Sequence, residues 1–372
     1  MSLYTKLSDF PYFPDNPNFN IMAIRAHSMN NSGCTDVGEV FRALNGMKKE
    51  GDPEEWHNRW RNMADSVHKL AEKAEKEGHL ITAKKAYLRS STYYRFATLF
   101  IKKDARALDA YEKHVGDFGK FAALSEPVIE RVQIPYEGIH MPGWYMPPKK
   151  KTGPKNPAYI YSTGQGGGCE VALQTSPTEA VERGIGVLFF DAPGCGGTRI
   201  YHHVYGVAEF EKPFKAAMDY LVSRPDIDAN NVGVAGSDFG AYNAVRAAVF
   251  DKRVKCCGLI TACYDALVDL YDYGQEEHRE SFASFFGETD DAKIREKLKP
   301  FTLKGVADKL TVPLLVLHAE ETVNYPIEPA YKLLREAKGP KELRVINSDH
   351  NTGSRRMEVL CGLADFFYDH LK

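Results

Sequence analysis

The sequence contains no long apolar run and no block of charge of one sign. None of its 372 residues lies in an apolar stretch of about 18 residues, and the first residues, MSLYTKLSDFPYF, do not have the basic segment and apolar core of a signal peptide. The formal net charge is -2, and no Lys/Arg cluster is interleaved with aromatic residues. The sequence therefore predicts no nucleic-acid partner and no membrane partner. We expect a soluble, cytoplasmic protein that acts on a small molecule.

Cysteine pairs with the spacing of a metal knuckle are also absent. The chain has seven cysteines, an odd number, and none forms a CxxC pair. The glycine-rich STGQGGG, residues 162–168, does not end in the Lys-Ser or Lys-Thr of a phosphate-binding loop, and the later VGVAGSDFG does not match G-x-G-x-x-G. We therefore expect neither a metal nor a cofactor, and free thiols that are mostly buried.

The pattern of apolar residues divides the chain into two domains. Residues 1–50 have no clear period and carry Asn-Pro and Asn-Asn-Ser-Gly turn signals, so we expect an irregular arm with one short helix at most. An Asp52-Pro53 start and apolar residues at steps of three and four predict a helix that ends near Gly78. Two further helices follow, the second from Asp104 to about Leu124. Residues 1–125 are thus predicted to be an N-terminal arm and a helical lid.

From residue 126 the pattern changes to strands. Residues 128–148 alternate like an antiparallel pair. Short apolar runs then alternate with helical segments; they are AYIYST, GVLFFD, NVGVAG, VKCCGLITA, PLLVLHA and LRVIN. Such alternation predicts an α/β domain over residues 126–372, with a mostly parallel sheet and helices on both faces. The polar helical segment 265–310 is expected to be a lid insertion.

The stretch GVAGSDFGAYNAV, residues 233–245, has the frame of a nucleophile elbow. In a G-x-nucleophile-x-G turn the reactive side chain lies between a strand and a helix, and Gly236 and Gly240 here flank Asp238 where a serine is usual. A shift of one residue would place Ser237 at the apex, but the glycines centre on Asp238. Backbone donors for an oxyanion are expected from Phe239 and from the glycine-rich turn with Gly164, Gln165 and Gly166. His350 follows the last strand, where a catalytic histidine belongs; an ordinary loop histidine is the alternative.

Several segments together resemble a known family. These are AEKEGHLITAKKAYLRSSTYYRFATLF, DAPGCGG, the elbow, TACYD and the C-terminal histidine. They are similar to α/β-hydrolases with an N-terminal helical lid, a group that includes fungal heptaketide hydrolyase, 2,6-dihydroxypseudooxynicotine hydrolase and the fermentation-respiration switch protein. The resemblance covers roughly residues 50–372. It implies a Ser-Asp-His triad that cleaves carbon–carbon or ester bonds next to a ketone in a pocket under the lid, and it is compatible with a homodimer.

The sequence departs from that triad at two positions. Asp238 stands at the nucleophile position, and Thr322 stands where the resemblance places the acid. Glu321 and Asp265 are the candidates for the supporting acid, and for each a plain loop carboxylate is the alternative reading. A serine triad is therefore absent.

An aspartate at the elbow favours the opening of strained electrophiles. Its carboxylate attacks an sp³ carbon to form an ester that His350 and water then hydrolyse, or it acts as a general base with His350 as the acid. This resembles epoxide hydrolases, and the resemblance suggests a polyketide-like secondary metabolite, as in fungal polyether pathways. The acid or substrate contact is expected among five tyrosines: Tyr205, Tyr264, Tyr271, Tyr273 and Tyr325. Carbon–carbon or ester hydrolysis, and a non-catalytic binding protein, are the alternatives.

Overall fold

The computed structural model describes residues 12–101, 104–151, 153–171, 177–274, 276–320, 325–348 and 355–371. The chain divides into two compact units, Met1–Glu130 and Arg131–Lys372. Each unit is described by itself.

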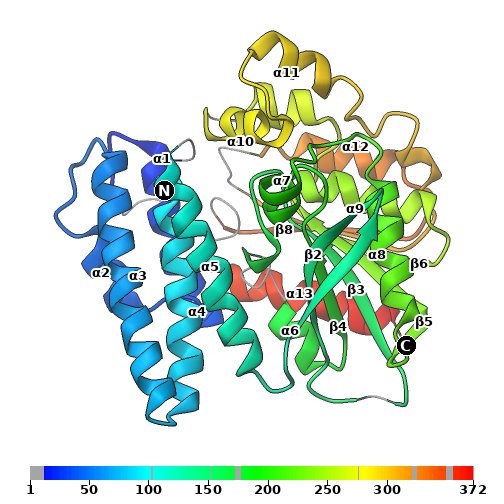
Figure 1. Ribbon diagram of the computed structural model, residues 1–372. Coiled ribbons are helices and arrows are strands. Elements are labelled where there is room, and N and C mark those ends of the chain that lie inside the picture. Colours follow the sequence, from blue (N-terminus) through cyan, green and yellow to red (C-terminus); the bar gives the residue numbers. More distant parts are fainter. Residues whose placement is uncertain are drawn as a thin grey trace. The chain divides into compact units, whose positions relative to one another are not determined.

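Helices build the first unit (Figure 1). They are α1 (Pro17–Ser28), α2 (Val37–Leu44), α3 (Pro53–Lys76), α4 (Leu80–Ala97) and α5 (Ala105–Ala123), with a short 3-10 turn at Met29–Ser32. The expectation of an irregular arm with at most one short helix was wrong. The Asn16 side chain accepts a hydrogen bond from the Phe19 N–H, and Pro17 occupies the first helical turn. The Asn-Pro pair thus caps and starts a helix instead of making a turn.

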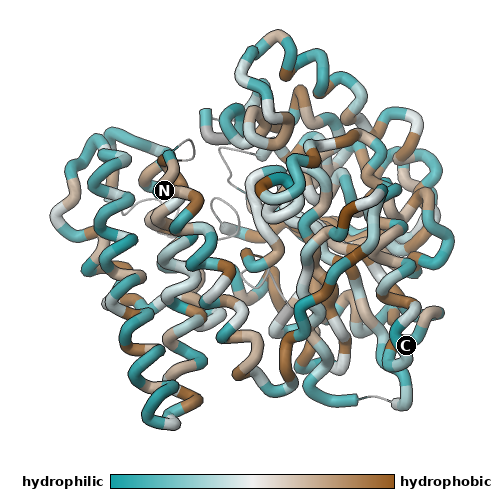
Figure 2. Tube along the Cα trace, in the orientation of Figure 1, coloured by the Kyte–Doolittle hydropathy of each residue, from teal (hydrophilic) through white to brown (hydrophobic). Residues whose placement is uncertain are grey.

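Helix α3 begins and ends where the sequence predicts. Asp52 accepts hydrogen bonds from the N–H groups of the first turn, and Gly78 follows the helix with φ +76°. Trp60 is fully buried, whereas Leu70, which belongs to the predicted apolar stripe, is 44% exposed and Ala71 is buried in its place. Figure 2 shows the resulting alternation of hydrophobic and hydrophilic residues along these helices.

An eight-stranded sheet forms the centre of the second unit. The strands are β1 (Glu130–Tyr136), β2 (Ile139–Met146), β3 (Asn156–Ser162), β4 (Gly186–Phe190), β5 (Ile227–Ser237), β6 (Val254–Ile260), β7 (Leu314–Ala319) and β8 (Lys341–Ile346). Their order is β1-β2-β4-β3-β5-β6-β7-β8. β2 pairs antiparallel with β4, and the pairs from β4 through β8 are parallel. The sheet therefore has the mostly parallel organisation that the strand–helix alternation predicts.

Helices cover both faces of this sheet. They are α6 (Pro177–Glu182), α7 (Gly196–His202), α8 (Glu211–Ser223), α9 (Phe239–Phe250), α12 (Glu328–Glu336) and α13 (Arg356–His370). On β3, Ile160 belongs to the same core cluster as Tyr242 of α9, whereas the neighbouring Tyr159 stacks on Phe367 of α13 at 4.3 Å. Because adjacent strand residues point to opposite faces, α9 and α13 lie on opposite sides of the sheet.

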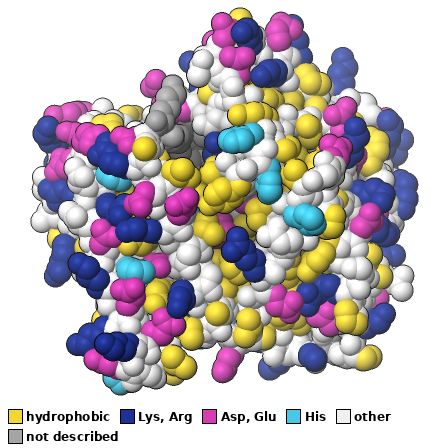
Figure 3. All heavy atoms as spheres, in the orientation of Figure 1, with side chains coloured by type: hydrophobic (Ala, Val, Ile, Leu, Met, Phe, Trp, Pro, Cys, Tyr) yellow, Lys and Arg dark blue, Asp and Glu magenta, His cyan; other side chains and the backbone are white. Residues whose placement is uncertain are grey.

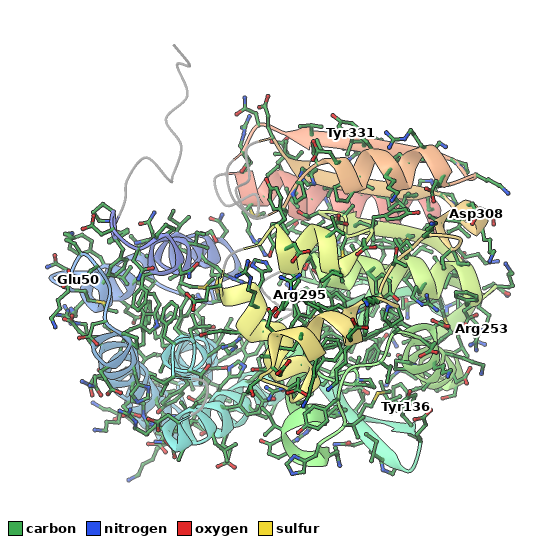
Figure 4. The ribbon with its side chains drawn as sticks, turned by 90° about the horizontal axis from the view of Figure 1, so that it is seen from above. Glu50, Tyr136, Arg253, Arg295, Asp308 and Tyr331 are labelled. Atoms are coloured by element: carbon green, nitrogen blue, oxygen red, sulfur yellow. The ribbon has the colours of Figure 1, made fainter. Side chains whose placement is uncertain are left out.

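The segment between β6 and β7 is helical, as expected. It contains a π-helix (Leu267–Asp272), α10 (Glu276–Phe286), α11 (Asp291–Leu298) and a 3-10 turn at Ala307–Lys309. Arg295 of α11, labelled in Figure 4, forms an ion pair with Asp272 of the π-helix and a second one with Asp291 of its own helix. Charged side chains thus connect α11 to the π-helix within the insertion.

Acidic and basic side chains are interspersed over the face that Figure 3 shows. In the described part of the chain, no helix has both the length and the apolar character that crossing a membrane requires.

Candidate active site

Asp238 lies at the apex of a sharp turn between β5 and α9. Its φ and ψ are +55° and -119°, a conformation that L-residues rarely adopt. The Asp238 N–H donates to the Ile260 carbonyl at 3.1 Å, and its own carbonyl accepts from the Ala241 N–H at 3.0 Å as the helix begins. This backbone presents the side chain at the carboxyl end of the sheet, between strand and helix.

Both flanking glycines are required by close backbone approach. A Cβ added at Gly236 would lie 2.0 Å from the Gly240 carbonyl oxygen, and one added at Gly240 would lie 2.3 Å from the Ser162 carbonyl oxygen. No side chain fits at either position without moving backbone. The two glycines therefore fix the apex at Asp238, not at Ser237.

The glycine-rich turn after β3 lies beside the first N–H of α9. A Cβ added at Gly164 would lie 3.9 Å from the Phe239 nitrogen. The Gly167 N–H donates to the Gly164 carbonyl at 3.2 Å, which makes Gln165 and Gly166 the centre of a tight turn. Gln165 is 8% exposed. The structure thus brings together the four residues predicted as oxyanion donors next to the elbow.

Helix α10 packs on the elbow through aromatic rings. Phe239 contacts Phe282 and Phe285 of α10 edge to face, with centroid separations of 5.4 and 5.2 Å. A Cβ added at Gly166 would lie 3.1 Å from the Ser281 hydroxyl oxygen, so α10 also touches the glycine-rich turn. The insertion is therefore part of the wall of this site.

The five candidate tyrosines fall into three environments. Tyr264 and Tyr271 donate their hydroxyl protons to Glu336 and Asp291, each at 2.7 Å. For both phenols, burial and then the carboxylate raise the pKa, that of Tyr271 to about 12. Tyr205 and Tyr273 are 43% and 50% exposed.

Tyr325 is buried, and its hydroxyl lies 3.0 Å from Nε2 of His278, which is also buried. His278 stands on α10, one turn before Ser281, and therefore on the same helix face as the residue that touches Gly166. The sequence does not single out His278, because it lies in the charged stretch EEHRESF, where nothing marks it as buried.

Asp265 forms part of a helix start. Its Oδ1 accepts from the Val268 N–H, and its own N–H donates to Asp269 Oδ2 at 2.7 Å. Asp269 is buried, accepts a second N–H from Tyr264, and has its pKa raised by burial to about 6. The two carboxylates thus organise the turn after β6. The other two predicted polar residues, Glu321 and His350, lie outside the described residues.

A buried group of three polar side chains lies next to the glycine-rich turn. Cys169, Glu170 and Asp191 each offer one atom within 4.8 Å of the others. Asp191 belongs to DAPGCGG, one of the segments that carry the family resemblance. Three ligands of this type are a possible metal set by composition, but both Asp191 oxygens accept backbone N–H groups, which suits a structural carboxylate better.

A mostly parallel eight-stranded sheet with a strained strand-to-helix apex beside a glycine turn defines an α/β-hydrolase, which confirms the expected fold class. The chain belongs to the prolyl oligopeptidase family, whose model matches residues 175–372.

Named relatives support this assignment. Hydrolyase ccsE of Aspergillus clavatus is 33% identical over 287 residues, which cover 70% of this chain and 63% of that protein. Alpha/beta hydrolase xenA of Xenoacremonium sinensis is 33% identical over 62% of this chain and 56% of its own length. Hydrolase ORFZ of Pyricularia oryzae is 28% identical over 84% of this chain and 85% of that protein. The chain thus spans only a little more than half of the first two relatives.

Solved structures match the chain over most of its length. The 2,6-dihydroxy-pseudo-oxynicotine hydrolase superposes with a TM-score of 0.82 at 22% identity, over 93% of this chain and 95% of that one. The likeness is one of fold. It agrees with the group of hydrolases that the sequence motifs indicate.

Proposed function

We propose that this protein is a hydrolase that opens an epoxide on a polyketide-like metabolite, with Asp238 as nucleophile or general base and His350 as its partner. The observation that carries the proposal is the carboxylate at the apex of the elbow, next to the Phe239 N–H and the glycine turn. Attack by a carboxylate on a carbonyl gives an anhydride, which is a poor route to acyl cleavage. Attack on an epoxide carbon gives a stable ester and an alkoxide.

The alkoxide then needs a proton. In the nucleophilic route the C–O bond breaks as the Asp238 ester forms, and the leaving oxygen takes the Tyr325 hydroxyl proton, which His278 helps to replace. Water, deprotonated by His350, cleaves the ester, and the proton on His350 returns through solvent to the Tyr325–His278 pair, so that the sum is epoxide plus water to diol. In the general-base route Asp238 takes the proton of water directly.

Isotope labelling separates these routes. One turnover in water enriched in ¹⁸O labels the Asp238 carboxylate if an ester forms, and labels only the diol if Asp238 is a base. Asp238→Asn is expected to lower epoxide turnover by at least about 1,000-fold, as the loss of a nucleophile does. The matched control, Ser237→Ala, changes the neighbouring side chain and is expected to retain turnover. Loss of turnover in Ser237→Ala, with full activity in Asp238→Asn, would overturn the proposal.

Ester or carbon–carbon hydrolysis is the second candidate, because the glycine turn beside Phe239 N–H is suited to a tetrahedral oxyanion. Asp238→Ser distinguishes the two functions. A gain of ester hydrolysis in this variant, together with no epoxide turnover by the unmodified protein, would favour acyl chemistry. A protein that binds such ligands and turns none of them over would instead be a binding protein.

A further inference from the structure

One buried carboxylate connects two loops beside the elbow. Asp191 follows β4 and is 1% exposed. Its Oδ1 accepts from the Cys169 N–H and its Oδ2 from the Gly197 N–H, both at 2.6 Å. Cys169 directly follows the glycine turn, and Gly197 lies in the first turn of α7. Asp191 therefore ties the end of the glycine turn to a helix start.

A second carboxyl group lies against the first. Glu170 is 6% exposed, and its Oε1 accepts from the Trp144 Nε1–H at 3.0 Å. Within the described residues its Oε2 has no hydrogen-bond partner, although it is buried. Oxygens of Glu170 and Asp191 lie within 4.8 Å of each other. A carboxylate this close opposes the ionisation of Asp191 inside the protein, because two like charges repel strongly where water is excluded.

We propose that Asp191 and Glu170 share one proton and act as positioning residues that hold the glycine turn, residues 164–168, in its working geometry. The use of this turn in catalysis rests on the proposed function, whereas the holding of the turn by the two carboxyl groups does not. With one proton for the two carboxyl groups, a single negative charge accepts both backbone N–H groups.

The surroundings contain little to balance a second charge. The titratable groups facing Asp191 are Glu170 and Cys169 from one loop and Cys195 from the other, and Arg199 acts on Cys195. Burial raises the pKa of both thiols, so they stay neutral. In the described ranges no ion pair reaches either carboxylate. A Cβ at Gly196 would lie 2.1 Å from Asp191 Oδ2, so the loop closes directly over the carboxyl group.

The direction of the pH effect follows from this environment. Burial and then the Glu170 charge raise the pKa of Asp191 to about 8, above the 3.8 of an unperturbed aspartate. Between these two pKa values the folded pair keeps a proton that the unfolded chain has lost. The contribution of the pair to the free energy of unfolding is therefore complete below about pH 4 and is lost as pH rises through about 8. Above that pH two charges repel inside the loop junction.

Two isosteric variants test the pair. In Glu170→Gln the amide N–H₂ donates to Asp191 without any titratable proton, so the turn stays in place at high pH. In Asp191→Asn the Nδ2 cannot accept the Gly197 N–H, so the turn loosens at every pH. Glu342→Gln, which removes an exposed carboxylate paired with Arg344, is the control.

Hydrogen exchange of the peptide 163–171 is measured at about pH 6.5 and pH 9, corrected for intrinsic exchange, together with kcat/KM. In the unmodified protein and in Glu342→Gln, protection of this peptide is expected to fall by about tenfold at the higher pH. Glu170→Gln is expected to keep its protection at the higher pH. Asp191→Asn is expected to show no protection at either pH. Three results would overturn the inference. Glu170→Gln could lose protection at the higher pH as the unmodified protein does, or Asp191→Asn could keep full protection. The unmodified protein could also hold one metal ion per chain that Glu170→Gln releases. Exchange requires no substrate, so failure of the epoxide proposal leaves this test intact.

Discussion

Asp238 adopts a backbone conformation that is unfavourable by about 1–3 kcal/mol, and contacts of the surrounding residues stabilise it. Gly236 and Gly240 allow strand and helix to approach more closely than any side chain permits. The Ile260 carbonyl holds the Asp238 N–H. The backbone geometry thus presents the Asp238 carboxylate at the apex of the turn.

A methyl group at Gly236 tests this dependence. Gly236→Ala is expected to destabilise the fold by more than about 2 kcal/mol and to abolish turnover, because the new Cβ would lie 2.0 Å from a carbonyl oxygen. Gly116→Ala is the control: Gly116 lies within α5 with nothing within 4 Å of an added Cβ, so alanine should stabilise the helix by about 0.8–1.0 kcal/mol. Urea unfolding measures the free energy of unfolding of both variants. Equal stability of Gly236→Ala and Gly116→Ala would show that the elbow does not require a glycine at position 236.

Asp269 provides a pH-dependent prediction. Its pKa in the folded protein is raised by burial to about 6 from 3.8, so its contribution is complete below about pH 4 and is lost as pH rises through 6. Asp269→Asn keeps an oxygen for the two N–H groups and removes the ionisation. Thermal melts from pH 4 to pH 7 should show the variant gaining stability relative to the unmodified protein. A difference that does not change with pH would show that the pKa of Asp269 is the same in the folded and unfolded protein, which would contradict the prediction.

At the scale of elements, α10 is attached to the elbow helix by a cluster of rings. Phe285 is fully buried and contacts Phe239, Phe210 and Phe286. It also fills the space above Gly206, where an added Cβ would lie 1.9 Å from its ring. Movement of α10 is therefore coupled to the packing around the first residue of α9.

Truncation of this ring should loosen the insertion. Phe285→Ala is expected to cost about 3–5 kcal/mol and to raise exchange in α10. Phe250→Ala, a change of the same size at a residue that is 48% exposed, should cost less than about 1 kcal/mol. Denaturant titration followed by exchange gives both values. A small loss in Phe285→Ala would mean that α10 is held by other contacts.

At the scale of the whole molecule, the chain has a separate core in each unit. Among the described residues, the main core cluster of the sheet unit runs from Val132 to Ala337. The helical unit has its own aromatic centre, where Trp56 and Trp60 pack with Phe96. Two cores of this kind are expected to lose stability separately.

A cavity in the helical unit tests that separation. Trp60→Ala is expected to remove about 3–5 kcal/mol from the unit to which it belongs. Amide exchange should then rise in α3 and α4, while β3, β5 and β6 stay protected. Loss of protection in both units together would show that they unfold as one cooperative block.

The sequence by itself determined what depends on neighbours along the chain. The spacing of apolar residues predicted the strands and helices, and Asp52-Pro53 predicted the start of α3. The glycine spacing predicted the apex at Asp238. These predictions were possible because they depend on local steric and hydrogen-bonding effects. The start of α1 was mistaken for a turn, since an Asn-Pro pair serves either purpose and the surrounding fold selects one.

Only the tertiary structure brought together groups that are distant along the chain. His278 meets Tyr325, and Glu170 meets Asp191, because the fold brings together segments that are far apart along the chain. Tyr264 and Tyr271, which looked equivalent to Tyr325, donate to carboxylates of α12 and α11. Burial and hydrogen bonding act through space, so the surroundings of these side chains were decided by the fold.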